Sequence, residues 1–476
     1  MAMRIYNTLT KSKDLFEPLV PGKVKIYVCG PTVYDSCHVG HARSVVVFDV
    51  VVRYLRAMDY SVTYIRNFTD VDDKIIQRAD EVGTSAHQLA ERYIEAFHRD
   101  MDALNVRRAD REPRVTEHID DIIGIVKILI DKKAAYLADG DVFFAVESFT
   151  DYGRLSGRKL ADMLAGSRVE INRNKRNPFD FVLWKSAKPG EPSWPSPWGD
   201  GRPGWHIECS AMSSRFLGET FDIHGGGKDL IFPHHENEIA QSEAAHGKPF
   251  ARIWMHNGFV NIDNQKMSKS LNNFLLIKDI LRAYHPESVR LFLLSSHYRS
   301  PIDFSDNNLK ESEKALDKIY GAVKRLDQEV GIEVVRQAEP GGANWQAFCE
   351  AMNDDFNTAK GIGILFTLVK EINRHLDQTS GAADAALATL AGDLGRMGGI
   401  LGVLQQPWSA FFEQQSRNRL RSSGLSADAI DGLVAERSAA RREKNWKRAD
   451  EIRRQLEKEG IILEDAAEGT LWKAVH

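Results

Sequence analysis

The sequence predicts an α/β fold: a Rossmann-type parallel sheet interrupted by an inserted α/β domain, followed by a helical bundle and a small C-terminal α+β domain. Strand-like and helical patterns alternate over about the first 115 residues, and that order is typical of a parallel sheet. A segment of different pattern, which ends in a loop rich in proline and tryptophan, separates two groups of strand-like runs. Helical patterns then dominate from about residue 286 to residue 404.

The chain begins with a strand–turn–helix unit. A mostly apolar run at 24–28 predicts a strand, and the helical spacing of apolar residues over 44–58 predicts the helix. A second strand over 62–67 completes a βαβ unit. Three aspartates over 70–73 and a charged helical stretch to about Asn105 follow. We interpret these aspartates as carboxylates at a helix N-terminus, with a metal site as the alternative.

The turn between the first strand and the first helix has the pattern of an anion site. Such a turn aims backbone N–H groups and the positive end of the helix at one point, and Gly40 leaves room for a flat base or a phosphate. His38 and His41 add hydrogen-bond donors on either side. A motif this short also occurs in tight strand–helix connections with surface histidines, so by itself it leaves both interpretations open.

Residues 116–200 are expected to form an insertion between two halves of the sheet. Residues 119–133 predict a helix and residues 141–146 predict a strand. The prolines between 188 and 203 exclude regular structure and indicate an ordered loop. Its tryptophans are expected to pack the loop against the protein, and stacking on bases is the alternative. The second half of the sheet should follow, with strands at 221–224 and 253–258.

Composition restricts the classes of function. The chain has 476 residues, a formal net charge of -4 and 43% hydrophobic residues, so several domains with ordinary cores are expected. Nucleic acid, if bound, must be met by local basic patches and not by a general positive field. Four cysteines in so long a chain do not make a disulfide framework, and no apolar run reaches membrane length. We expect a cytosolic protein, a monomer, without membrane contact.

Two segments are dense in side chains that bind metals: 205–209 and 232–238. Pro233 fits the first turn of a helix, which would put His234 and Glu238 on one face, four residues apart. With one or two thiolates they would form a set of nitrogen, oxygen and sulfur ligands suited to zinc. Cys29 is the attractive further ligand, because it ends the first strand at the rim where parallel strands gather. Unrelated residues with a buried cysteine among them are the alternative.

Residues 38–41 and 266–270, His-Val-Gly-His and Lys-Met-Ser-Lys-Ser, resemble in this order the two signatures of class I aminoacyl-tRNA synthetases. Residues 29–34, 204–212 and 224–238 resemble more narrowly the signatures of the cysteinyl-tRNA synthetase family. The resemblance continues through residues 297–303 and a signature at 352–358, and covers almost the whole chain. Val39 stands where isoleucine is usual, which is a conservative departure.

The resemblance implies one zinc ion per chain, held by two cysteines, a histidine and a glutamate. The matching positions are Cys29, Cys209, His234 and Glu238. Cys37 and Cys349 fall outside them. Zinc would select the substrate thiolate over the hydroxyl of serine, which shape alone rejects poorly. The insertion is short enough for a chain without an editing domain.

The reaction implied by the resemblance is activation of L-cysteine by ATP with Mg²⁺, then transfer to the terminal ribose of tRNA(Cys). The catalytic residues expected are His38, His41, Lys266 and Lys269, with Lys269 the first choice for stabilising the transition state. The ATP-binding residues expected are Pro31, Thr32, His38, Gly40, His41, Gly226, Asp229, Lys266, Ser268 and Lys269, with Gly227 beside them. The residues expected to bind the amino acid are Cys29, Gly30, Thr69, Trp205 and His224.

The C-terminal tail predicts two charged helices from about residue 426 and a hairpin formed by 461–464 and 470–473. Between 436 and 458, nine lysines and arginines face five acids, and an aromatic residue lies among them. Charge and composition alone favour a solvated helix, whereas the resemblance favours contact with single-stranded RNA. The tRNA contacts expected are Arg441, Arg442, Trp446, Lys447 and Arg448.

The expected domains are the first half of the catalytic domain, the connective insertion, its second half, the lysine signature with a stem-contact region, the helical bundle and the anticodon domain. Their expected bounds are 1–115, 116–200, 201–265, 266–312, 313–405 and 406–476. The nearest alternative is a ligase of thiol biosynthesis that transfers cysteine to an amino-sugar conjugate. A non-enzymatic, zinc-containing RNA-binding protein is the alternative of another class.

Overall fold

The computed structural model describes residues 2–160, 174–262, 265–266, 275–331, 340–379, 384–423, 426–466 and 469–474. At its centre lies a parallel sheet with the strand order β10-β9-β3-β4. The strands are β3 (Lys23–Val28), β4 (Ser61–Arg66), β9 (Phe221–Gly227) and β10 (Ala251–Asn257). The predicted parallel sheet is confirmed, including its assembly from two halves that lie far apart in the sequence.

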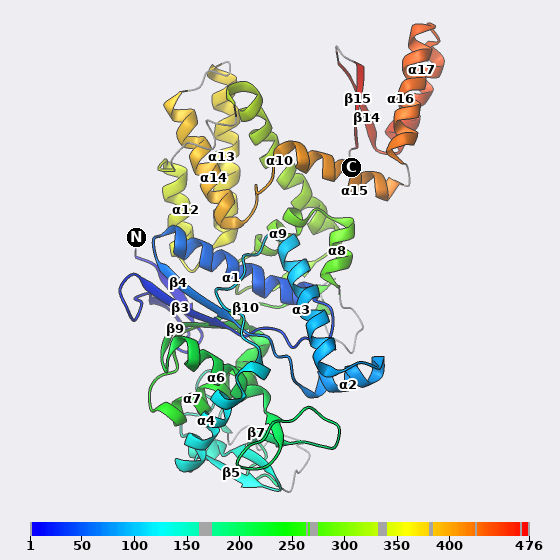
Figure 1. Cartoon of the computed structure of the whole chain (residues 1–476). Coiled ribbons are helices and arrows are strands. Elements are labelled where there is room, and N and C mark those ends of the chain that lie inside the picture. Colours follow the sequence, from blue (N-terminus) through cyan, green and yellow to red (C-terminus); the bar gives the residue numbers. More distant parts are fainter. Residues whose placement is uncertain are drawn as a thin grey trace.

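The two faces of this sheet belong to different cores. Ile26 and Val28 of β3 pack with helix α1 (Val39–Ala57) and the helices beyond it, whereas Tyr27 packs with the insertion on the other face. Figure 1 shows α1 above the sheet and α4, α6 and α7 below it. Alternation along one buried strand therefore joins two layers, which is why β3 is apolar on both faces.

An N-terminal hairpin, β1 (Arg4–Asn7) and β2 (Ser12–Leu15), precedes the sheet, and β1 packs beside β10. Two helices follow β4: α2 (Asp73–Val82) and α3 (Ala86–Ala103). Asp72 caps α2 by accepting from Lys74 N at 2.9 Å, as expected of a carboxylate at a helix start.

The other two predicted carboxylates have different partners. Asp70 accepts from the backbone N–H and the hydroxyl of Thr116, at 3.1 and 2.6 Å. Asp73 lies in the first turn of α2 and pairs with Lys185 at 2.9 Å and with Arg202. These two carboxylates tie the first half of the sheet to the insertion.

The insertion holds α4 (Ile119–Asp131) and an antiparallel sheet in the order β5-β6-β7-β8. Its strands are β5 (Ala135–Ala138), β6 (Asp141–Phe144), β7 (Phe181–Ser186) and β8 (Gly201–Pro203). The antiparallel sheet therefore reaches Pro203, beyond the expected end at residue 200. Trp198 packs edge-on against Trp184, with ring centroids 6.1 Å apart, so the proline-rich loop is packed down as predicted.

The second half of the sheet is covered by α6 (Trp205–Leu217) and α7 (Glu236–His246). Pro233 lies in a short segment, η4 (Ile231–His235), whose one non-helical residue is Phe232. The helical backbone therefore begins at Pro233, as predicted, and continues through His235 into α7. His234 and Glu238 face each other one turn apart, with His234 Nε2 at 3.0 Å from Glu238 Oε1.

Helices dominate the rest of the chain, as predicted. A small sheet in the order β12-β11-β13 consists of β11 (Val260–Ile262), β12 (Gln265–Lys266) and β13 (Ile302–Phe304). The helices around it and beyond it are α8 (Ile277–Ala283), α9 (Pro286–Leu294), α10 (Asp306–Val330), α12 (Ala343–Asn353), α13 (Thr358–Thr379), α14 (Ala385–Leu401) and α15 (Trp408–Ser423). Short 3-10 turns are η1 (Val115–Glu117), η2 (Val146–Ser148) and η3 (Lys228–Leu230).

The C-terminal domain has its own small core around Ile430, Ile452 and Ile461. Its elements are α16 (Ala427–Arg442), α17 (Trp446–Lys458), β14 (Ile461–Ala466) and β15 (Gly469–Ala474). The two predicted helices and the predicted hairpin are confirmed. None of the described helices combines the length and the apolar character needed to cross a membrane.

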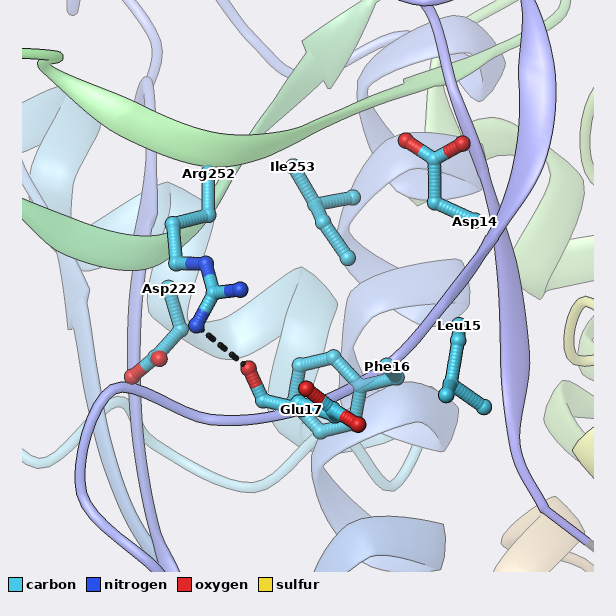
Figure 2. A pocket seen from close by; sticks show the side chains of 7 residues that line it. All are labelled: Asp14, Leu15, Phe16, Glu17, Asp222, Arg252 and Ile253. Carbon is cyan, nitrogen blue, oxygen red and sulfur yellow. Dashed lines mark hydrogen bonds between the residues drawn. The ribbon is translucent and has the colours of Figure 1, made fainter.

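A cavity of about 80 Å³ lies at the amino-terminal edge of the central sheet (Figure 2). Asp222, at the start of β9, accepts from Leu19 N at 2.6 Å and from Lys25 N at 2.8 Å. Arg252, at the start of β10, donates to Glu17 O at 2.8 Å. These groups fasten the segment between β2 and β3 to the sheet, at the edge opposite to the carboxyl ends of the strands.

A buried group of charges joins the sheet domain to the helical bundle. Arg290 of α9 is fully buried, pairs with Asp49 of α1, and donates to Leu401 O at 2.6 Å. Asp49 also accepts from Arg53 Nε at 2.8 Å, so one carboxylate serves two guanidinium groups. A Cβ atom at Gly402 would lie 2.4 Å from Arg290, which explains the glycine there.

We predict that Asp49→Ala lowers the free energy of unfolding by about 3–5 kcal/mol, because it leaves two buried guanidinium groups without their counter-ion. Urea unfolding followed by circular dichroism measures the change. Glu81→Ala is the matched control, since it breaks the Arg78–Glu81 pair, whose side chains are 43% and 48% exposed, and should cost less than about 1 kcal/mol. Equal effects of the two substitutions would contradict this account.

Candidate active site

The candidate site lies at the carboxyl ends of β3 and β9. These neighbours lie on either side of the point where the strand order reverses, which is where open α/β sheets bind ligands. Cys29 N donates to Gly225 O at 3.2 Å and so continues the pairing past the end of β3. Gly30 N donates to Asn67 Oδ1 at 2.9 Å, and a Cβ atom at Gly30 would lie 1.5 Å from Asn67 O. Only glycine permits this approach of the two loops.

The two histidines of the first signature form the start of α1. His38 is the N-cap residue, and its Nδ1 accepts from Gly40 N at 3.1 Å and from His41 N at 3.3 Å. His41 Nδ1 accepts in turn from His38 N at 3.4 Å, and the two rings stack with centroids 3.6 Å apart. Because Nδ1 accepts in both rings, the neutral imidazoles carry their protons on Nε2. Both Nε2 atoms are therefore donors.

The first signature is paired with the chain that leaves the second one. Val39 N donates to Leu275 O at 3.0 Å, and Ile277 N donates to Cys37 O at 2.9 Å. Lys266 lies in β12, where its backbone pairs with Asn261, and its side chain is outside what the structure describes. Ser268 and Lys269 also lie outside the described residues.

Four predicted metal ligands come together beside this turn. Cys29 follows β3 directly, and Cys209, His234 and Glu238 come from α6, η4 and α7. The ligand atoms of all four lie within 4.8 Å of one another. Cys29 Sγ lies 3.5 Å from Cys209 Sγ and 3.3 Å from Glu238 Oε1. His234 Nε2 lies 3.5 Å from Cys29 Sγ and 3.6 Å from Cys209 Sγ.

These separations fit one small ion with four ligands. Ordinary zinc–sulfur, zinc–nitrogen and zinc–oxygen bonds in a tetrahedron place the ligand atoms roughly 3.3–3.8 Å apart. Five of the six separations in the cluster run from 3.0 to 3.6 Å, and the sixth, between Cys209 and Glu238, is within 4.8 Å. The 3.5 Å between the two sulfurs is also far beyond a disulfide bond, and both cysteines are free.

Burial sets the charge of the cluster. Burial opposes ionisation of Glu238, but His224 and His234 hold its pKa well below the usual range. Burial also opposes ionisation of Cys209, but a hydrogen bond from Cys29 and the His234 imidazole lower the pKa of its thiol to about 6. Burial would lower the pKa of His234, yet Glu238 and Cys209 raise it to about 10. Burial raises the pKa of Cys29 well above the ordinary value. The cluster thus carries a carboxylate and a thiolate that call for a cation.

A second combination of side chains, Cys29, His224, His235 and Glu238, satisfies the same distance limit. It is the poorer metal set, because its two histidines approach different oxygens of Glu238. His224 Nε2 bonds to Oε2 at 2.8 Å, whereas His235 Nε2 lies 3.9 Å from Oε1. His235 also pairs with His256, Nδ1 to Nε2, at 2.8 Å. These histidines surround the first set and orient it, as partners of metal ligands commonly do.

Three of the residues predicted to bind the amino acid contact the cluster or a neighbour of it. Trp205 is 38% exposed and stacks on the His234 ring, with centroids 4.3 Å apart. His224 is buried and bound to Glu238, and Thr69 Oγ1 donates to Glu208 Oε2 at 2.8 Å.

Sequence reasoning missed Glu208, His206 and Asn67. Glu208 is buried, and burial raises its pKa well above the usual range. His206 Nδ1 lies 2.9 Å from His234 Nδ1. A charged residue next to Cys209 and a further histidine in a motif already rich in ligands were the available signals, whereas nothing in the sequence marks Asn67.

Close packing explains the glycines at the end of β9, two of which were predicted to lie at the ATP site. A Cβ atom at Gly225 would lie 2.3 Å from the Phe48 ring, and one at Gly226 would lie 2.9 Å from the His235 ring. A Cβ atom at Gly227 would lie 2.3 Å from Asp229 Oδ1. Side chains therefore lie directly against the backbone at this strand end. Pro31 and Thr32 lie across from it, where Thr32 pairs with Thr69.

The predicted RNA contacts lie in another domain, at the junction of α16 and α17. Trp446 is 58% exposed, and Arg441, Arg442 and Lys447 are exposed with it. Arg448 pairs with Glu436 at 2.8 Å and with Glu451 at 3.5 Å. This segment therefore combines the charge pairs of a solvated helix with an exposed aromatic ring among cations.

Three family matches divide the chain. Residues 15–314 match the tRNA synthetases class I (C) catalytic domain, residues 347–405 match the DALR domain, and residues 423–472 match the cysteinyl-tRNA ligase anticodon binding domain. Solved structures of lower identity show the same fold. Methionyl-tRNA synthetase of Mycobacterium tuberculosis, in complex with methionyl-adenylate, is 17% identical, with a TM-score of 0.57, over 85% of this chain and 94% of that chain.

Curated relatives match over the full length. A cysteine–tRNA ligase of Syntrophobacter fumaroxidans is 55% identical, over 99% of this chain and 100% of the relative. One of Geobacter metallireducens is 53% identical, with the same coverage of both chains. Together with the catalytic-domain match over residues 15–314, these identities show that the chain belongs to the cysteine–tRNA ligase family of class I aminoacyl-tRNA synthetases.

Proposed function

We propose that the chain joins L-cysteine to tRNA(Cys) at the expense of ATP. The cysteine carboxylate attacks the α-phosphate of ATP, which forms cysteinyl-adenylate and releases pyrophosphate. A hydroxyl of the terminal ribose of the tRNA then attacks the carbonyl carbon and releases AMP. The observation that carries this proposal is the compact set of two thiols, one imidazole and one carboxylate beside the histidine turn.

In this proposal Cys29, Cys209, His234 and Glu238 hold one zinc ion, which matches the thiolate-rich donor set. When bound, zinc supplies a soft Lewis acid that ligates the substrate thiolate and takes a serine hydroxyl far less well. The protein orients the ligands itself: His206 and Trp205 hold the His234 ring, and His224 holds the Glu238 carboxylate.

The histidine turn supplies donors for the phosphates. Negative charge grows on the phosphoryl oxygens and on the leaving pyrophosphate, so fixed donors and cations are the main means of catalysis. His38 and His41 present Nε2–H groups at the positive end of α1, because their Nδ1 atoms are committed to the cap. Lys266, Ser268 and Lys269 are proposed to approach the phosphates from the other side, with Mg²⁺ accompanying ATP. Pro31, Thr32, Gly40, Gly226 and Asp229 are proposed to line the ATP site.

The chain beyond the bundle favours tRNA as acceptor over an amino-sugar conjugate, because residues 423–472 match an anticodon binding domain. Arg441, Arg442, Trp446, Lys447 and Arg448 are the proposed contacts with the anticodon arm. We keep the division into six parts as part of the proposal, with the inserted sheet ending at Pro203. The monomeric state and the cytosolic location stay predictions.

The test is cysteine-dependent exchange of pyrophosphate into ATP, with serine as competitor, followed by charging of tRNA. We expect exchange with cysteine and not with serine, and charging of tRNA(Cys). The wild type should hold about one zinc ion per chain, and Cys209→Ser should lose it. The rate of pyrophosphate exchange in this variant should fall at least about 100-fold. Cys349→Ser is the matched control, because Cys349 is also a free cysteine but lies in α12, outside the cluster.

Two results would overturn the proposal. Exchange without charging would assign the chain to a ligase with a small-molecule acceptor. Exchange with serine at the rate seen with cysteine would show that the cluster does not select the thiolate.

Zinc uptake should release protons, because ligation needs a thiolate and a neutral imidazole. Cys29 holds its proton at neutral pH, and His234, with a pKa of about 10, carries an extra one. We expect about two protons released per zinc at pH 7.5, and an apparent affinity that falls about 100-fold for each pH unit lowered. Calorimetry in buffers with different ionisation enthalpies measures the number. Uptake without proton release would contradict this charge assignment.

His38 has two roles that one pair of variants separates. His38→Asn keeps a cap acceptor, so the free energy of unfolding should change by less than about 0.5 kcal/mol. It removes the Nε2–H donor, so kcat of the exchange reaction should fall about 10²- to 10³-fold. His38→Ala should lose the same activity and about 1 kcal/mol of stability as well. Full activity of His38→Asn would show that only the cap matters.

A further inference from the structure

A second cavity, of about 340 Å³, opens beside the first signature and shares no residue with the metal cluster. It is lined by Asp35 and Ser36, which precede the histidine turn, and by side chains of α2, α3 and α8. Its volume falls at the lower end of the range of about 300–1,000 Å³ that is common for ligand sites. None of the roles described above involves it.

The lining is rich in cations. Arg78, Arg92, Arg99 and Lys278 line the cavity together with two carboxylates, Asp35 and Asp100. Among the described residues, Arg92, Arg99 and Lys278 take part in no ion pair, and each side chain is exposed. Burial raises the pKa of Asp100 to about 6, so at mildly acidic pH this carboxyl offsets less of the positive charge of the cavity. In a chain of net charge -4, four cations against two carboxylates around one cavity indicate an anionic ligand.

The backbone places this cavity next to the proposed reaction. Cys37 and Val39 exchange hydrogen bonds with Ile277 and Leu275, at 2.9 and 3.0 Å. Lys278 follows this pairing directly, and Ser36 precedes it. A ligand in the cavity therefore lies against the two segments that lead into the first signature and out of the second.

The cavity also lies on the same side of the molecule as the C-terminal domain. Helix α15 packs against α8, the helix that carries Lys278. Figure 1 shows α2, α3 and α8 on the same side of the molecule as α15, α16 and α17. A long polyanion held by the cations of α16 and α17 would reach the histidine turn along this face, whereas a small anion has no need of it.

An aromatic side chain suits a nucleic acid in particular. Tyr93 lines the cavity half-buried, and the Arg92 guanidinium carbon lies 5.8 Å from the centre of its ring. A ring beside cations along a groove is the usual means of holding single-stranded nucleic acid, since bases stack while phosphates pair.

We propose that this cavity binds a backbone phosphate of the single-stranded 3′ end of the tRNA acceptor arm, with Arg99 and Lys278 as its main cations and Tyr93 against a neighbouring base. The proposal rests on the function proposed above, because the terminal ribose must reach the adenylate beside His38 and His41. Free pyrophosphate is also an anion and would pair with the same cations. The position of the C-terminal domain on the same side of the molecule and the aromatic ring of Tyr93 favour RNA.

The test compares the double variant Arg99→Gln/Lys278→Gln with Lys127→Gln, a matched control that removes an exposed cation of α4 outside the cavity. The probe is an RNA minihelix of the acceptor arm, with and without its single-stranded 3′ end. We expect the double variant to bind the intact minihelix at least about tenfold more weakly, and the slope of log K against log salt to fall by about 0.7 for each lost contact. Lys127→Gln should bind as the wild type does, and Arg99→Lys/Lys278→Arg should restore binding.

Three outcomes would overturn the proposal. Unchanged affinity and salt slope would show that the cavity does not contact RNA, and equal losses for the blunt minihelix would place the contact on the duplex. A raised KM for pyrophosphate in the exchange reaction would assign the cavity to the free anion. Binding of the deacylated minihelix needs no catalysis, so a wild type that binds it but fails to charge tRNA would contradict the proposed function and not this site.

Discussion

One buried carboxylate governs the architecture of the site. Glu238 has no exposed surface, and an ionised carboxylate in such a place is costly unless its oxygens are paired. His224 and His234 provide that pairing, one on each oxygen. His224 stacks in turn on Trp254 of β10, with ring centroids 4.3 Å apart. The need to neutralise one group therefore fixes the relative positions of β9, α7 and β10, and it brings the metal ligands of four separate segments into one cluster.

Much of this arrangement could be predicted from local patterns. Period-2 and period-3.6 spacing indicated the strands, the long helices and the C-terminal hairpin, because these periods reflect which face each element buries. The four metal ligands could be proposed from residue type and from the rule that parallel strands end at one rim. That rule places Cys29 beside the other three without any knowledge of the loops between them.

What escaped prediction depends on contacts between segments that carry no local signal. Arg290 and Asp49 are far apart in the chain, and each looks like an ordinary helix residue until packing buries both. The basic cavity is built from a loop and three helices, so neither composition nor spacing could indicate it.

The pairing of residues 37–39 with residues 275–277 has a consequence for how the two signatures work together. His38 caps α1 with its side chain, and its own backbone pairs with Leu276. The position of this cap residue therefore depends on the position of the distant segment. A shift of that segment would move the backbone of the cap, and with it the direction of both Nε2–H groups, because the stacked rings of His38 and His41 are locked to each other. The histidine turn and residues 275–277 are thus mechanically one unit, although more than 200 residues separate them in the sequence. Since Ser36 and Lys278 flank this pairing, a strand of RNA held between them would act on the geometry of the histidine turn directly.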